Sequence, residues 1–213
     1  MASGKTAVGL SLARELGYRL VDTGMIYRAV AWLALERGAD VDDEPAVVAL
    51  TEAAEFELGQ PAANGGPTIS VDGRDVTAEL RTPEVDRSVS HVSRMSGVRQ
   101  AVLELQRRLA RDGRIIMLGR DIGTVVLPDA PLKIYLDASA DVRARRRHAE
   151  LHAAGIERPQ SEILAELRQR DEMDSNRHVS PLRPAADAIV IDTDALSLEQ
   201  VIERVRREAV SRP

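Results

Sequence analysis

Met1-Ala2-Ser3-Gly4-Lys5-Thr6 opens the chain and points to its fold. The last three residues match the end of the phosphate-binding loop pattern, in which a glycine and four further residues precede Gly-Lys-Ser/Thr. Apolar residues recur at helical spacing from Lys5 to Leu16, and Gly17 provides a helix stop. The loop is therefore expected at a helix N-terminus, where backbone N–H groups and the helix dipole favour phosphate.

The first glycine of this pattern would lie two places before Met1, counting back from Gly4. In folds of this kind a buried strand leads into the loop. We expect the natural protein to start upstream, which would make Met1 a misassigned start or an expression boundary. A sheet that lacks this strand would leave buried N–H and C=O groups unpaired, at a cost of about 1–3 kcal/mol each.

The composition describes an ordinary globular chain of 213 residues, which suits a single domain. The absence of cysteine excludes disulfides, thiolate metal sites and cysteine nucleophiles. The net charge of −5 argues against general nucleic-acid binding, and no apolar run is long enough for a membrane span. We therefore expect a cytoplasmic protein that binds neither nucleic acid nor membrane. Only two of the 29 basic residues are lysines, Lys5 and Lys133.

Periodicity along the chain predicts strands separated by helices, which indicates an α/β fold with a parallel sheet. The segment from Gly59 to Arg81 differs, because Asp72-Gly73 between short alternating stretches predicts an antiparallel hairpin. The expected strands are 19–22, 68–71, 115–118, 132–136 and 188–191. The expected helices are 5–16, 24–36, 44–56, 83–94, 97–111, one from 140, one through 164 and 167 toward 176, and 198–210.

Two polar segments directly follow expected strands. Asp22-Thr23-Gly24-Met25-Ile26-Tyr27-Arg28 ends the strand at 19–22, and Gly119-Arg120-Asp121-Ile122-Gly123 follows the strand at 115–118. Ligands bind at the carboxyl ends of strands in open α/β sheets. Arginine can hold a phosphate through two parallel hydrogen bonds, and aspartate can accept hydrogen bonds from ribose or base. Taken singly, either segment could also be a polar loop or a surface ion pair.

Two further segments place arginine on the expected carboxy-terminal helices. Arg170, Asp174 and Arg177 share one helical face, which is also the usual spacing of a solvated salt-bridge ladder. Arg143-Ala144-Arg145-Arg146-Arg147 contains three consecutive arginines, whose repulsion a bound triphosphate would relieve. Partly solvated helix arginines are the alternative. His148 and His152 have i, i+4 spacing but no evident third ligand, so a metal site is not indicated.

In this order, the segments resemble the bacterial-type cytidylate kinases from Ala2 to about Val205. The resemblance implies an α/β P-loop nucleoside monophosphate kinase, with a parallel sheet flanked by helices, a small antiparallel insertion and a lid. The first, central strand of that sheet would be absent from this chain. The implied single kinase domain covers 1–213, with a nucleoside monophosphate (NMP)-binding region at 24–96 that includes the insertion at about 59–81, and a lid region at 143–170.

The implied reaction moves the γ-phosphoryl group of ATP to CMP or dCMP with Mg²⁺, giving ADP and CDP or dCDP in pyrimidine nucleotide metabolism. The family expectation is a monomer. Residues that match catalytic positions are Lys5, Arg120, Arg146 and Arg147. Residues that match ATP-binding positions are Ala2, Ser3, Gly4, Lys5, Thr6, Arg146 and Arg147, with the Thr6 hydroxyl a Mg²⁺ partner. Residues that match CMP-binding positions are Thr23, Tyr27, Arg28, Ser90, Arg99, Arg120, Asp121, Arg170, Asp174 and Arg177, of which Ser90, Arg99 and Asp121 would read cytosine.

Two positions depart from the family pattern. Ala7 stands where many members have a second hydroxyl, and Leu118 stands where some have an acid before Gly-Arg-Asp. If that acid helps to hold Mg²⁺, Asp22 or the phosphates would supply those contacts here. Two other readings stay open: a truncated, inactive or nucleotide-binding-only remnant, and a kinase of the same fold acting on UMP or shikimate.

Overall fold

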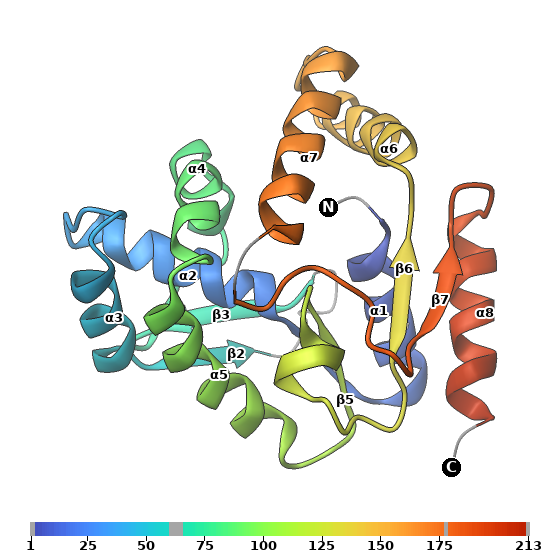
Figure 1. The fold of residues 1–213 in the computed structure, drawn as a ribbon, viewed down its shortest axis with the longest axis horizontal. Coiled ribbons are helices and arrows are strands. Elements are labelled where there is room, and N and C mark those ends of the chain that lie inside the picture. Colours follow the sequence, from blue (N-terminus) through green and yellow to red (C-terminus); the bar gives the residue numbers. More distant parts are fainter. Residues whose placement is uncertain (1–2, 60–65, 177–178, 212–213) are drawn as a thin grey trace. The chain divides into compact units, whose positions relative to one another are not determined.

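The computed structural model describes residues 3–59, 66–176 and 179–211 (Figure 1). It divides into two compact units. The phosphate-loop unit contains residues 1–12 and 120–213, and the hairpin unit contains residues 13–119. Helix α1 (Lys5–Leu16) follows the phosphate loop, as its apolar spacing predicts.

The hairpin unit is built on a parallel pair of strands. β1 (Arg19–Asp22) pairs with β5 (Ile115–Leu118) in the register Arg19 to Ile115 through Asp22 to Leu118. Because the strands are parallel, the segments that follow Asp22 and Leu118 leave at the same edge. The helices of this unit are α2 (Thr23–Glu36), α3 (Glu44–Ala53), α4 (Pro83–Val92) and α5 (Ser96–Ala110), with a 3-10 turn at Glu79–Arg81.

Helix α2 forms the centre of the larger hydrophobic core. It is apolar on nearly every side, and a helix of that kind is stable only when other elements surround it. Its residues Ile26, Ala29, Val30 and Leu33 are almost completely buried. The core also includes side chains from α4, α5 and the antiparallel sheet, so this helix holds a fixed place in its unit.

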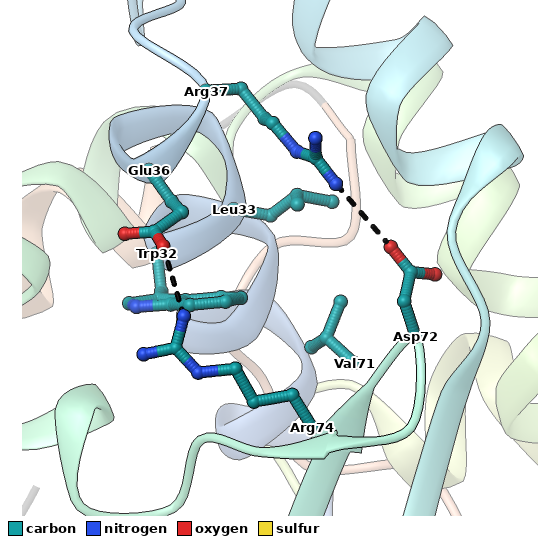
Figure 2. Close-up of a pocket in the computed structure, with 7 residues that line it drawn as sticks. All are labelled: Trp32, Leu33, Glu36, Arg37, Val71, Asp72 and Arg74. Carbon is teal, nitrogen blue, oxygen red and sulfur yellow. Dashed lines mark hydrogen bonds and ion pairs between the residues drawn. The ribbon is translucent and has the colours of Figure 1, made fainter.

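The predicted insertion is a three-stranded antiparallel sheet of β2 (Phe56–Gly59), β3 (Thr68–Val71) and β4 (Arg74–Asp75). Asp72 and Gly73 both have positive φ angles, 51° and 77°, as the tight hairpin turn requires. Figure 2 shows how the hairpin meets α2: the Arg74 guanidinium lies 5.2 Å from the Trp32 ring centroid, and Asp72 is 3.7 Å from Arg37. A surface pocket lies here, and no residue predicted to bind substrate lines it.

The phosphate-loop unit contains a second parallel pair, β6 (Ile134–Asp137) and β7 (Ile189–Asp192). Its helices are α6 (Ala140–Ala153), α7 (Gln160–Ser175) and α8 (Leu198–Val210). Helices α6 and α7 lie side by side around a small core of Ala144, Ile163 and Leu167 (Figure 1). Ser197 and Gln200 form a capping box that starts α8.

Most predicted elements are confirmed to within a few residues. The helix expected at 44–56 ends at Ala53, because Phe56 begins β2 and pairs with Val71. A π-helical turn at Ile122–Val126, which periodicity did not indicate, follows Asp121. The parallel strands form two pairs, and the described residues contain no strand that pairs with both β5 and β6, the position of the central strand that the resemblance implies is absent from this chain.

Within the described ranges, none of the helices combines the length and the apolar character needed to cross a membrane.

Lys133 connects three segments of the phosphate-loop unit. Its ammonium donates to the Pro128 carbonyl oxygen and lies 2.6 Å from Asp187, and its side chain is only 8% exposed. The aliphatic part packs against Gly123, where an added Cβ would lie 3.1 Å from the lysine Cδ. A compact ammonium fits this place better than the planar fork of arginine.

We expect Lys133→Met to lower the free energy of unfolding by about 1–3 kcal/mol, because it removes hydrogen bonds from a buried charged donor. Urea unfolding followed by circular dichroism measures the change. Asp187→Asn is the control, since that side chain is 65% exposed and its pairing contributes little. If Asp187→Asn lowers the free energy of unfolding as much as Lys133→Met does, the stabilisation does not come from the buried lysine side chain and its bond to Pro128.

Candidate active site

The phosphate loop ends at a helix N-terminus, as predicted. Gly4 has a φ angle of 82°, a left-handed conformation that a residue with a Cβ rarely adopts, and its carbonyl accepts from the Val8 N–H at 3.0 Å. Lys5 folds back over the loop, and its ammonium donates to the Ser3 hydroxyl at 2.8 Å. Ser3 is 5% exposed. The loop therefore places a lysine ammonium beside the amides of the first turn, which is an arrangement suited to phosphate.

The segment after β5 is wound tightly around Asp121. Its carbonyl oxygen accepts from the N–H groups of Val125 at 2.9 Å and of Thr124 and Val126 at 3.3 Å. Asp121 is buried. These bonds hold the Asp121 carbonyl in place, and Arg120 directly precedes this turn.

Arg120 forms an ion pair with Asp174, which lies in α7. The Asp174 side chain is 7% exposed and that of Arg120 is 22% exposed, so the pair is largely removed from water. The Asp174 carbonyl also accepts from the Leu182 N–H at 2.9 Å, which ties the following loop to the helix. The structure thus brings together two residues that are 54 positions apart and that the family resemblance assigns to the same acceptor site.

Arg170 lies one helical turn before Asp174 on α7, and part of its side chain is buried. Two other predicted residues, Ala2 and Arg177, lie outside the described residues.

The hairpin unit holds the remaining predicted residues. The Thr23 hydroxyl donates to the Leu118 carbonyl oxygen at 2.9 Å, which joins the start of α2 to the end of β5. Arg28 donates to the Leu80 carbonyl oxygen at 3.0 Å and lies 2.5 Å from Asp86 in α4. Asp86 was not among the predicted residues, although it is in the first turn of a helix near Ser90.

Arg99 and Tyr27 lie together in this unit. The Arg99 guanidinium is 5.4 Å from the Tyr27 ring centroid and donates to the Ser93 carbonyl oxygen at 3.0 Å. Both residues are buried, with Arg99 only 7% exposed. An arginine that is buried on an aromatic face keeps its hydrogen-bond donors in a fixed position. Ser90 lies near the end of α4, and its backbone carbonyl accepts from the Ser93 hydroxyl at 3.5 Å.

Three of the four arginines at 143–147 of α6 have protein partners in this structure. Arg143 makes a bidentate ion pair with Asp171, and Arg146 donates to the Thr193 carbonyl oxygen at 2.6 Å. Arg147 pairs with Glu150 at 3.1 Å near the surface. Asp171 and Thr193 are structural partners of these arginines that sequence spacing did not indicate.

The loop after β7 is held close to the start of α6. The Thr193 hydroxyl donates to the Asp137 carbonyl oxygen at 2.9 Å, and the Asp194 carboxylate accepts from the Ser139 N–H at 2.7 Å. Hydrogen bonds from the Ser139 backbone and side chain hold the pKa of Asp194 below its ordinary value.

Tyr135 on β6 has a raised pKa, because burial and then the charge of Asp137 disfavour the phenolate.

The sequence model of the family described as "Cytidylate kinase" matches residues 1–211. The chain belongs to the cytidylate kinase family. A cytidylate kinase of Pelotomaculum thermopropionicum is 44% identical over 203 residues, which cover 95% of this chain and 89% of that protein. A cytidylate kinase of Pseudomonas aeruginosa strain LESB58 is 44% identical over 207 residues, covering 96% and 90%.

A bifunctional pantoate ligase/cytidylate kinase of Synechococcus strain JA-2-3B'a(2-13) is also similar, at 45% identity over 204 residues. The match covers 95% of this chain but only 38% of that protein. The family membership confirms the resemblance predicted from the ordered motifs, and it makes the chain a nucleoside monophosphate kinase.

No cluster of three or more His, Cys, Asp or Glu side chains suited to a metal ion occurs within the described part of the chain. A family member needs no such cluster if Mg²⁺ arrives on ATP, because Mg²⁺ commonly keeps its waters and binds through phosphates and one or two protein oxygens. Thr6 fits that donor set, since its hydroxyl lies in the first turn of α1 beside Lys5.

Proposed function

We propose that this chain transfers the γ-phosphoryl group of ATP to CMP or dCMP, giving ADP and CDP or dCDP. The observation that supports this most is the match of the cytidylate kinase family over residues 1–211, which includes every predicted motif. The buried pair of Arg99 and Tyr27 supports a nucleotide base as the acceptor's recognition element, because it places fixed donors in a protected position.

On the donor side, the proposed roles follow from the phosphate loop. The Lys5 ammonium would leave Ser3 to bind the β- and γ-phosphates, while the amides at the start of α1 bind the phosphate chain. The Thr6 hydroxyl would hold Mg²⁺, which neutralises phosphate charge when bound with ATP. Arg146 and Arg147 would add positive charge from the lid region, 143–170.

On the acceptor side, we assign the NMP-binding region to 24–96. Ser90 in this region, together with Arg99 and Asp121 outside it, would read cytosine. Arg28 and Arg120 would bind the acceptor phosphate and orient its oxygen toward the γ-phosphorus. Thr23, Tyr27, Arg170, Asp174 and Arg177 complete this proposed set. Phosphoryl transfer asks the protein mainly for positioning and for stabilisation of charge, and no covalent nucleophile is needed. We also propose that the enzyme is a monomer and acts in the cytoplasm.

A coupled assay of ADP release tests the proposal directly. We expect turnover with CMP and dCMP, and at least tenfold lower kcat/KM with UMP and AMP, because a site built to hydrogen-bond one base strongly rejects another. Preference for UMP or shikimate would favour the related-kinase reading. ATP binding without turnover of any acceptor would favour the binding-only reading.

A further inference from the structure

Helix α5 carries Arg99 but does not cap its own first turn. Its N-cap residue, Met95, makes no side-chain capping hydrogen bond. The first N–H groups of a helix have no intrahelical partner, and a side-chain oxygen normally accepts from at least one of them. Here the oxygen comes from another helix: Glu44 of α3 accepts from the Gly97 N–H at 2.6 Å and from the Ser96 hydroxyl at 3.2 Å.

The contact depends on a close approach of α3 to α5. A Cβ added at Gly97 would lie 2.7 Å from Cγ2 of Val48 and 3.2 Å from the Glu44 carboxylate. The glycine therefore lets the carboxylate reach the backbone directly. Because Glu44 is only partly exposed, its charge near the positive end of the helix dipole is less screened than a surface charge would be.

A second acidic residue just before α3 contacts helix α4 through an ion pair whose two side chains are exposed. Asp42, two residues before Glu44, lies 2.9 Å from Nδ1 of His91, which directly follows Ser90. We call Asp42 and Glu44 the α3 acidic brace. Asp42 contacts His91, the residue after Ser90. Glu44 contacts Gly97, two residues before Arg99.

We propose that the α3 acidic brace positions two of the three cytosine-reading residues, Ser90 and Arg99, and that Glu44 does so by fixing the first turn of α5 beneath Arg99. The inference rests on the proposed function, in which Arg99 contacts the base. Arg99 is buried, stacked on Tyr27 and bonded to the Ser93 carbonyl, so a displacement of the first turn of α5 would shift its guanidinium relative to these partners. A small rotation of the first turn would move those donors off the base, and small misplacements have large kinetic effects.

The test is the steady-state kinetics of Glu44→Ala. We expect KM for CMP to rise about tenfold, as for loss of hydrogen bonds to a charged acceptor, while kcat and KM for ATP change less than about twofold. The preference for CMP over UMP should fall in parallel. Glu44→Gln keeps an acceptor oxygen and should raise KM for CMP only about threefold. Glu52→Ala is the matched control, because it removes an exposed carboxylate from the same helix.

A double-mutant cycle separates positioning from general support of the fold. If Glu44 acts through Arg99, Glu44→Ala should not raise KM for CMP further in an Arg99→Ala background. A further rise of the same size in that background would overturn the proposal. If Glu44→Ala does not fold, unchanged KM and unchanged base preference in Glu44→Gln would overturn it as well.

The outcome also distinguishes this inference from the proposed function. A wild-type chain that does not phosphorylate CMP overturns the proposed function, and this inference with it. An active wild-type chain whose Glu44 variants keep the KM for CMP and the base preference overturns the brace alone.

Discussion

Arg120→Ala should lower kcat about a thousandfold, the size of effect seen when a charged group that stabilises a phosphoryl-transfer transition state is removed. KM for ATP should change less than about threefold. The physical reason is the position of Arg120 after β5, held by the turn wound around the Asp121 carbonyl. Such a guanidinium can meet charge that develops on the transferred group. Steady-state kinetics and ATP titration measure the two quantities separately.

The ion pair with Asp174 requires a control, because removing Arg120 leaves a buried carboxylate without that partner. Loss of one member of a buried pair costs about 3–5 kcal/mol, so thermal unfolding must be compared with wild type. Arg120→Lys keeps the charge and should retain more activity than Arg120→Ala. Added guanidinium ion should restore part of the activity of Arg120→Ala. Turnover equal to wild type in a folded Arg120→Ala variant would refute the role.

The sequence predicted the elements whose patterns are local. The apolar spacing after the phosphate loop predicted α1, and Asp72-Gly73 predicted the hairpin between β3 and β4 because both positions need positive φ. The predicted end of α3 was wrong. Helical spacing continues through Phe56, but in the structure that residue pairs with Val71 across the sheet. Pairing between distant strands is not encoded in the period of one segment.

The predicted site residues came from motifs, and their partners came only from the structure. Arg120 and Asp174 were each named from sequence, but their ion pair depends on a contact between segments 54 residues apart. No sequence motif marked Glu44, because the N–H group that it caps belongs to a different helix, 53 residues further along the chain. The arginines of α6 were interpreted through their repulsion, whereas Asp171 and Thr193 supply partners from other elements.

Arg143 shows why such partners matter for stability. Its Nε donates to the Ala138 carbonyl oxygen at 2.9 Å, and its two terminal nitrogens bind the Asp171 carboxylate at 3.1 and 2.5 Å. The Arg143 side chain is 11% exposed and that of Asp171 is 30% exposed. One guanidinium therefore connects the end of β6, helix α6 and helix α7.

We expect Arg143→Ala to lower the free energy of unfolding by about 3 kcal/mol, the low end for a broken buried pair, because Asp171 can regain some water. Urea unfolding measures the loss, and amide hydrogen exchange should show it in α6 and α7. Arg168→Ala is the matched control. Its ion pair with Asp141 also joins α6 to α7, but both side chains are more than 60% exposed.

The control should lose less than about 1 kcal/mol, as exposed pairs do. A double-mutant cycle of Arg143→Ala with Asp171→Ala should give a coupling energy of about 1–3 kcal/mol, because the residues are in direct contact. Equal losses for Arg143→Ala and Arg168→Ala, or no coupling to Asp171, would contradict the prediction. Burial, and not the presence of an ion pair between the helices, is what makes the Arg143 contact the stronger one.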